Sequence, residues 1–247
     1  MRSANPALND STFSRLTRAG YGETMTLDGT VTRTGILLIC VLAAAAITWS
    51  QFFATRDPAA VAPYILGGAI GGFVMAMVTV FKKEWSPVTA PIYAVLEGLF
   101  LGGASAMLEL RFPGIAMQAV GLTFGTCFCL LLAYRSGMIR ATEKFKLGIF
   151  AATGGIALIY VVSMLLGFFG VRIPYIYDSG PIGILFSLVV VSVAALNLIL
   201  DFDFIEQGVM RGAPKYMEWY SGFALMVTLI WLYLEMLRLL SKLRDRR

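Results

Sequence analysis

Three acidic residues lie inside or at the end of long apolar stretches of this 247-residue chain. Glu97 lies within YAVLEGLFLGG, Asp201 closes AALNLIL, and Glu235 lies within WLYLEMLRLL. A carboxylate that faces lipid at bilayer depth costs several kcal/mol, so such residues turn inward, pair or bind a proton. Their oxygens also suit hard cations such as Ca²⁺. The three acids are therefore candidates for proton or cation binding, and the alternative is that they only fix helix packing through hydrogen bonds.

Helical spacing separates Asp201 from its neighbour Asp203. Asp201 shares a helix face with the small, polar stripe that includes Asn197, four residues earlier. Asp203 lies about 200° around the helix from Asp201. We therefore expect Asp201 to face the protein interior and Asp203 to reach the cytoplasmic interface, whereas Glu206 and Glu218 are interpreted as loop charges.

The residue inventory argues against several kinds of catalytic and metal site. The chain contains no histidine, which excludes imidazole metal sites and His-based triads. Its three cysteines, Cys40, Cys127 and Cys129, lie in apolar stretches and are interpreted as packing residues. The motifs of serine hydrolases, zinc proteases and nucleotide-binding loops are absent from the sequence. We therefore expect no enzyme activity, no cofactor and no assigned metal site.

The apolar stretches themselves are the elements that must position these acids. Hydrophobic residues make up 58% of the chain and charged residues 14%, about half the share in a soluble domain. Seven stretches approach the roughly 20 residues that a membrane-spanning helix needs, and they lack the alternation of barrel strands. The sequence predicts an all-α, polytopic membrane protein with seven transmembrane helices, at 35–53, 62–81, 88–108, 115–134, 147–170, 181–200 and 221–241.

Closely spaced glycines predict where these helices approach one another. Two stretches carry the GxxxG spacing, which permits close contact between helix backbones. We interpret these glycines as contacts within one bundle rather than as a dimerisation surface. They are Gly67, Gly68, Gly71, Gly72, Gly98 and Gly102.

The distribution of Lys and Arg predicts the orientation. With the N-terminus inside, the inner segments up to the seventh stretch hold twelve basic residues and the outer loops hold three. This predicts a multi-pass protein of the cell (inner) membrane with a polar, cytoplasmic N-terminal tail at 1–34, a transmembrane domain at 35–241 and a basic C-terminal tail at 242–247. Seven full crossings would place that basic tail outside, so full crossing of the last stretch stays open. The same topology explains the net charge of +5 without nucleic acid.

The order of these features resembles the Bax inhibitor family, the transmembrane Bax-inhibitor-motif proteins, in one of its bacterial branches. The resemblance covers most of 35–241. It rests on YAVLEG in the third stretch, on LNLILDF at the end of the sixth, on LYLE in the seventh, and on the basic pair Lys82 and Lys83 in FKKEWSP.

The resemblance implies a bundle whose last helix is surrounded by the other six, and a pH-sensitive calcium leak. In the family, two acids on spans six and seven share a proton, and a basic residue from span two latches onto them. Carried over, the pair would be Asp201 or Asp203 with Glu235, and the latch Lys82 or Lys83. The seventh-span acid here is Glu rather than the commoner Asp. It also lies about 20 Å along its helix, so the pair requires the helices to slide or break.

Three functions compete at this point. The first is a proton-gated cation leak in which Glu97, Asp201 and Glu235 supply oxygen ligands. The second is a non-conducting regulator that binds other membrane proteins through its tails, since other family members modulate proteases or suppress cell death. The third is a secondary transporter, although no inverted repeat is visible. The expected partners are the lipid bilayer, Ca²⁺ and other membrane proteins, with no nucleic acid.

Overall fold

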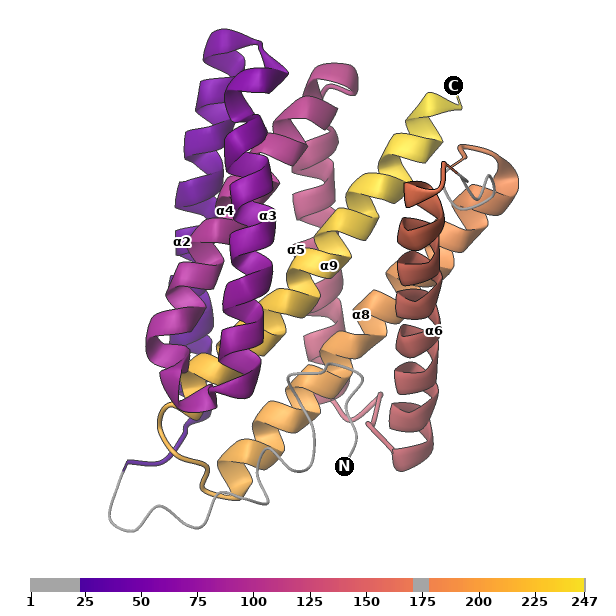
Figure 1. The fold of residues 1–247 in the computed structure, drawn as a ribbon. Coiled ribbons are helices and arrows are strands. Elements are labelled where there is room, and N and C mark those ends of the chain that lie inside the picture. Colours follow the sequence, from indigo (N-terminus) through magenta and orange to yellow (C-terminus); the bar gives the residue numbers. More distant parts are fainter. Residues whose placement is uncertain (1–22, 171–177, 247) are drawn as a thin grey trace. The chain divides into compact units, whose positions relative to one another are not determined.

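The computed structural model describes residues 23–170 and 178–246 of the chain. Within these residues, seven helices are long and apolar enough to cross a membrane, so the predicted all-α membrane fold is confirmed. A short 3₁₀ helix, η1 (Lys83–Trp85), precedes the third of them. The seven, labelled in Figure 1, are α2 (Leu27–Thr55), α3 (Pro58–Phe81), α4 (Ser86–Arg111), α5 (Ile115–Arg135), α6 (Glu143–Phe168), α8 (Pro181–Met210) and α9 (Met217–Asp245).

Several helices extend beyond their apolar stretches. Helix α2 begins at Leu27, inside the expected tail, because the hydroxyl of Thr26 accepts a hydrogen bond from the Gly29 N–H (3.0 Å) and caps the helix. Helix α9 continues to Asp245, so most of the expected C-terminal tail is helical. Its 29 residues span about 43 Å, which exceeds the roughly 30 Å of a bilayer core. The last helix is therefore long enough to cross.

The chain divides into two compact units, and helices α8 and α9 contribute to both. Unit 1 holds the described residues of Met117–Asp203 and Thr228–Arg247, and therefore α5, α6, most of α8 and the second part of α9. Unit 2 holds the described residues of Ser11–Ala116 and Phe204–Val227, and therefore α2, α3, α4, the end of α8 and the start of α9.

In unit 2, glycines of α4 bring its backbone against α2. A Cβ atom added at Gly98 would collide with the carbonyl oxygen of Val41, and one at Gly102 with that of Ala45. These contacts leave no space for any larger residue. The predicted use of this glycine pair for packing within the bundle is confirmed.

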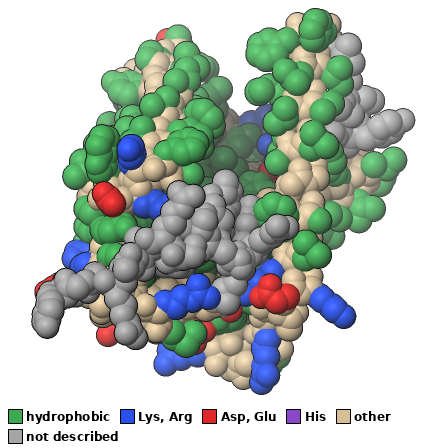
Figure 2. Space-filling model, turned by 60° about the horizontal axis from the view of Figure 1, so that its bottom comes forward, with side chains coloured by type: hydrophobic (Ala, Val, Ile, Leu, Met, Phe, Trp, Pro, Cys, Tyr) green, Lys and Arg blue, Asp and Glu red, His purple; other side chains and the backbone are tan. Residues whose placement is uncertain are grey.

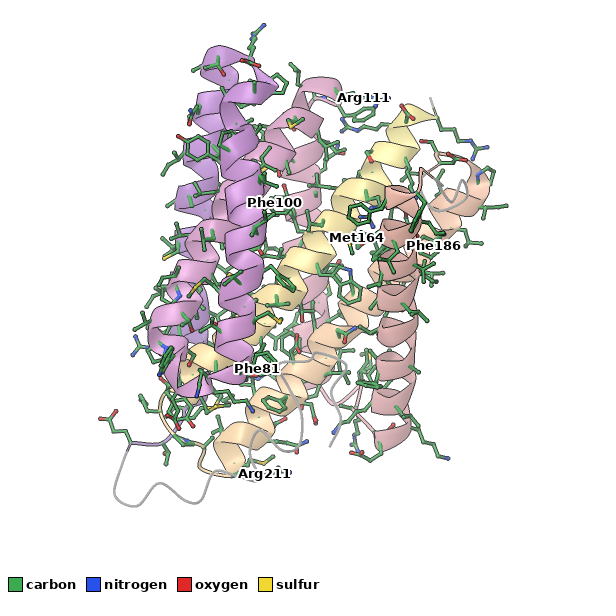
Figure 3. The ribbon with its side chains drawn as sticks, viewed as in Figure 1. Phe81, Phe100, Arg111, Met164, Phe186 and Arg211 are labelled. Carbon is green, nitrogen blue, oxygen red and sulfur yellow. The ribbon has the colours of Figure 1, made fainter. Side chains whose placement is uncertain are left out.

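The glycines of α3 divide between two faces of their helix. Gly68 lies against the α4 backbone, where its Cβ would be 2.8 Å from the amide nitrogen of Phe100 (Figure 3). Gly72 lies against the side chain of Glu97, whereas Gly67 faces open space. Gly71 lies beside the Leu96 side chain of α4, so Gly67 is the only one of these four glycines without a neighbour there.

In unit 1, aromatic and branched side chains join α6, α8 and α9. Ile156 of α6 packs with Val190 of α8, and Trp231 of α9 covers the same cluster. One turn away, the rings of Tyr160 and Phe186 meet edge to face, with centroids 6.3 Å apart (Figure 3). These contacts show which residues of α6, α8 and α9 lie opposite one another.

Hydrophobic side chains also cover the outer sides of the helices (Figure 2). Phe73, Phe128 and Leu185 each expose about three-fifths of their surface. A soluble protein rarely exposes so much contiguous apolar surface, and a membrane-spanning one presents it to lipid. The exposed faces therefore agree with a multi-pass protein.

Candidate functional site

Asp201 is fully buried on α8 in unit 1, with an exposed fraction of 0%. One turn earlier, the amide of Asn197 donates to the Thr153 hydroxyl of α6 (2.9 Å) and to the Val193 carbonyl (2.8 Å). The expected interior position of the polar face of α8 is therefore confirmed.

Asp203 is only partly buried and has a basic partner that the sequence analysis did not identify. Its carboxylate forms an ion pair of 2.8 Å with Lys146 of α6, whose side chain is 7% exposed. Lys146 also lies 3.4 Å from the exposed carboxylate of Glu143. A sequence signal for the burial of Lys146 exists, because it shares one helical stripe with Ile149 and Ile156.

Glu235 is buried on α9, and Arg238 of the same helix neutralises its charge. Its carboxylate accepts hydrogen bonds from Arg238 Nη1 (2.7 and 2.9 Å) and from the Tyr160 hydroxyl of α6 (2.9 Å). Arg238 also donates to the Tyr160 oxygen and lies over the Tyr160 ring, 5.0 Å from its centroid. The three side chains form a closed Glu–Arg–Tyr group.

The structure does not bring Asp201 and Glu235 together, so the expected proton-sharing pair is corrected. Tyr160 contacts both Glu235 and Phe186, which places Glu235 near the level of Phe186 on α8. Asp201 lies fifteen residues further along α8, or roughly 20 Å. The alternative pair of Asp203 with Glu235 fails for the same reason. Asp203 pairs with Lys146, and Glu235 pairs with Arg238.

Lys242, expected in a solvated tail, is instead buried in unit 1. Its ammonium donates to the Gly183 carbonyl (3.0 Å) and to the Ser187 hydroxyl (2.9 Å) of α8. Glu235, Arg238 and Lys242 are spaced three and four residues apart, which places them on one face of α9. This spacing is the sequence signal that could have indicated that Lys242 lies on the same helix face as the buried Glu235.

Glu97 lies in unit 2. An acid at bilayer depth is expected to turn inward, but the Glu97 side chain is only half-buried. Its carboxylate occupies the space beside Gly72 of α3, where an added Cβ would be 2.7 Å from its Oε1. The candidate latch residues belong to the same unit. Lys82 caps the end of α3 and is exposed, and Lys83 lies over the Tyr220 ring, 5.7 Å from its centroid. Their role as a latch stays a prediction.

Glu218, interpreted from the sequence as a loop charge, is 1% exposed at the start of α9. It accepts hydrogen bonds from the Thr26 N–H (3.0 Å) and hydroxyl (2.9 Å), and it pairs with Lys215 (3.2 Å) and with Arg33 at 4.0 Å. Thr26 is 192 residues away in sequence, so no local pattern indicates the contact. The interpretation as a loop charge is wrong.

Backbone pairing reinforces this contact, and we call Glu23–Thr26 with Ala213–Glu218 the Glu218 clamp. The Met25 N–H donates to the Ala213 carbonyl (2.7 Å), and the Lys215 N–H donates to the Glu23 carbonyl (3.1 Å). Within the clamp, burial raises the pKa of the Tyr216 phenol, and the negative charge of Glu84 raises it further by a smaller amount. The clamp fastens the start of α2 to the start of α9.

The acids do not assemble into a metal centre within the part of the chain that the structure describes. No group of three or more His, Cys, Asp or Glu side chains there is placed to hold a metal ion. A single buried carboxylate can still exchange a proton, or give one oxygen ligand to a passing cation.

Comparison with known proteins identifies the family. A family model described as Bax inhibitor 1 like matches residues 5–245, nearly the whole chain. No curated protein and no solved structure gives a significant match. The chain, a multi-pass membrane protein by its helices, therefore belongs to the Bax inhibitor 1-like family.

Proposed function

We propose that this protein is a proton-sensitive cation leak pathway, mainly for calcium, and that Asp201 is its proton-binding acid. The observation that supports the proposal is the complete burial of this carboxylate on a membrane-spanning helix. Acidic residues inside membrane helices are costly and mark ion pathways or proton relays. The family match and the seven apolar helices support the membrane location that an ion pathway requires.

The surroundings of Asp201 suit this role. Asn197 and Thr153 continue the polar face by one turn, so oxygen atoms follow one another along α8 and α6. The carboxylate has a negative charge when ionised and attracts a hard cation through its oxygens. A proton removes that charge, so cation flux should rise as the pH rises through the titration of Asp201.

The other acids of unit 1 fit the role of sensor less well. Glu235 is held by Arg238 and Tyr160, and Asp203 is held by Lys146. The proposed sensor is therefore the fully buried acid Asp201 in place of an acid pair.

Calcium flux into liposomes tests the proposal. The purified protein is reconstituted with a trapped calcium dye, and the initial flux is recorded over a range of external pH. We expect a flux that rises with pH in the wild type and a pH-independent flux in Asp201→Asn, which keeps the shape of the side chain. Folded wild-type protein that gives no flux at any pH would contradict the leak and favour a non-conducting regulator of other membrane proteins.

A further inference from the structure

Glu97 occupies the middle of a membrane-spanning helix in unit 2. It is the twelfth of the 26 residues of α4, so it lies roughly 17 Å from the start of that helix. This distance places it well inside the hydrocarbon core of a bilayer, which is about 30 Å thick. Its side chain is half-buried, and its neighbour Val95 is exposed on the apolar surface.

The helices that pack around Glu97 supply no opposite charge. Helix α3 contains no Lys or Arg from Pro58 to Phe81, and α2 contains none between Thr34 and Thr55. On α4 itself, the only basic residue is Arg111, fourteen residues away or roughly 21 Å. The ion pairs that stabilise Asp203, Glu218 and Glu235 therefore have no counterpart at Glu97.

The titratable side chains on these helices near the level of Glu97 are neutral in their ordinary state. They are Cys40 on α2 and Tyr93 on α4, and the ring of Tyr93 packs edge to face on Phe223 of α9. Helix α3 contributes Gly72 at the carboxylate and Tyr64 near its start. Within the described residues, no hydrogen bond or ion pair satisfies the Glu97 carboxyl.

Coordination chemistry distinguishes the two ligands that such a carboxyl could take. A hard cation needs about six oxygen ligands, whereas the residue that the Glu97 carboxylate faces on α3 is Gly72, which has no side-chain oxygen. A proton needs none, because it makes the group neutral in a medium that penalises charge. The proton is therefore the favoured ligand.

We infer that Glu97 is a second proton-binding site of the membrane interior, distinct from Asp201, and that it reacts with reagents dissolved in the lipid. The missing side chain at Gly72 provides the space in which the neutral carboxyl lies. This site does not depend on calcium conduction, so it stands or falls separately from the proposed leak.

An apolar carbodiimide reports on such a carboxyl. The acid adds across a C=N bond of dicyclohexylcarbodiimide, so that a carboxyl oxygen bonds to the central carbon and the acid proton moves to nitrogen. The adduct rearranges to an N-acylurea without a leaving group, and the peptide gains the mass of the whole reagent. Only the protonated acid reacts, so labelling reads out the proton.

The experiment treats the full-length protein in liposomes with dicyclohexylcarbodiimide and maps the adducts by peptide mass spectrometry. We expect the peptide that contains Glu97 to be labelled, with labelling that falls about tenfold per pH unit once the carboxyl is ionised. A water-soluble carbodiimide should label it far less. Glu97→Gln should remove this adduct.

Two results would overturn the inference. In one, Glu97 stays unlabelled in the wild type at low pH, which means that the carboxyl is charged or enclosed. In the other, the water-soluble reagent labels it as well as the apolar one, which means that it faces water. Both are read on the wild-type protein, so they hold even if Glu97→Gln fails to fold.

Discussion

Replacing Glu218 with Ala removes the buried charge on which the Glu218 clamp is built. The substitution deletes the acceptor of two hydrogen bonds from Thr26 and the counter-charge of Lys215 and Arg33. It also opens the space that the carboxylate occupies beside Gly29, where no Cβ fits. The start of α2 then loses its attachment to the start of α9.

The size of the effect follows from the exposure of the partners. Hydrogen bonds to a charged group contribute about 1.5–3 kcal/mol each, and breaking a fully buried ion pair costs about 3–5 kcal/mol. Here the side chains of Lys215 and Arg33 are 42% and 34% exposed, so water can solvate most of their charge after the change, although Arg33 Nε itself is buried. We expect Glu218→Ala to cost about 2–4 kcal/mol, and Glu218→Gln, which keeps an acceptor for Thr26, about 1–2 kcal/mol.

Unfolding in mixed micelles, followed by circular dichroism as the share of dodecyl sulfate rises, measures these differences. Hydrogen exchange at residues 23–26 should increase in the same variants. Glu84→Ala is the matched control, because Glu84 is an exposed acid near Tyr216 and its loss should change stability by less than about 0.5 kcal/mol. Equal stability of Glu218→Ala and Glu84→Ala would refute the reasoning.

Gly102→Ala should destabilise the protein by about 1–3 kcal/mol in the same unfolding assay because its Cβ meets the α2 backbone, whereas Gly67→Ala should be nearly neutral. Asp203→Asn should cost about 3 kcal/mol because it leaves buried Lys146 short of a counter-charge, and adding Lys146→Met should restore part of that loss, which unfolding measurements on both variants would show. A reporter fused at residue 140 should read as cytoplasmic because of the basic loop around it, and a periplasmic signal would contradict the topology.

The fold was predictable because its signals are local. The length and apolarity of each stretch indicate a spanning helix, and GxxxG spacing indicates a close contact without naming the partner. The burial of Asp201 also follows from its position four residues after Asn197. Helix ends were less predictable, since the capping bond at Thr26 extends α2 through polar residues.

The partners of the acids were less predictable because packing, not spacing, selects them. Lys146 and Asp203 are 57 residues apart, and Glu218 and Thr26 are 192 apart. Neither pair leaves a pattern in a single sequence. Arg238 was the exception, because it follows Glu235 by three residues and offers a counter-charge on the same helix face.

The pH dependence of calcium flux in Asp201→Asn tests the central claim most directly when it is compared with Lys146→Met/Asp203→Asn. The double variant removes the neighbouring ion pair without leaving a lone charge, and both proteins are reconstituted at equal density. The account predicts that the double variant keeps a flux that rises with pH, and that Asp201→Asn gives a flux that no longer changes with pH. A normal pH response in folded Asp201→Asn, or its loss in the double variant alone, would contradict the assignment of Asp201 as the proton-binding acid.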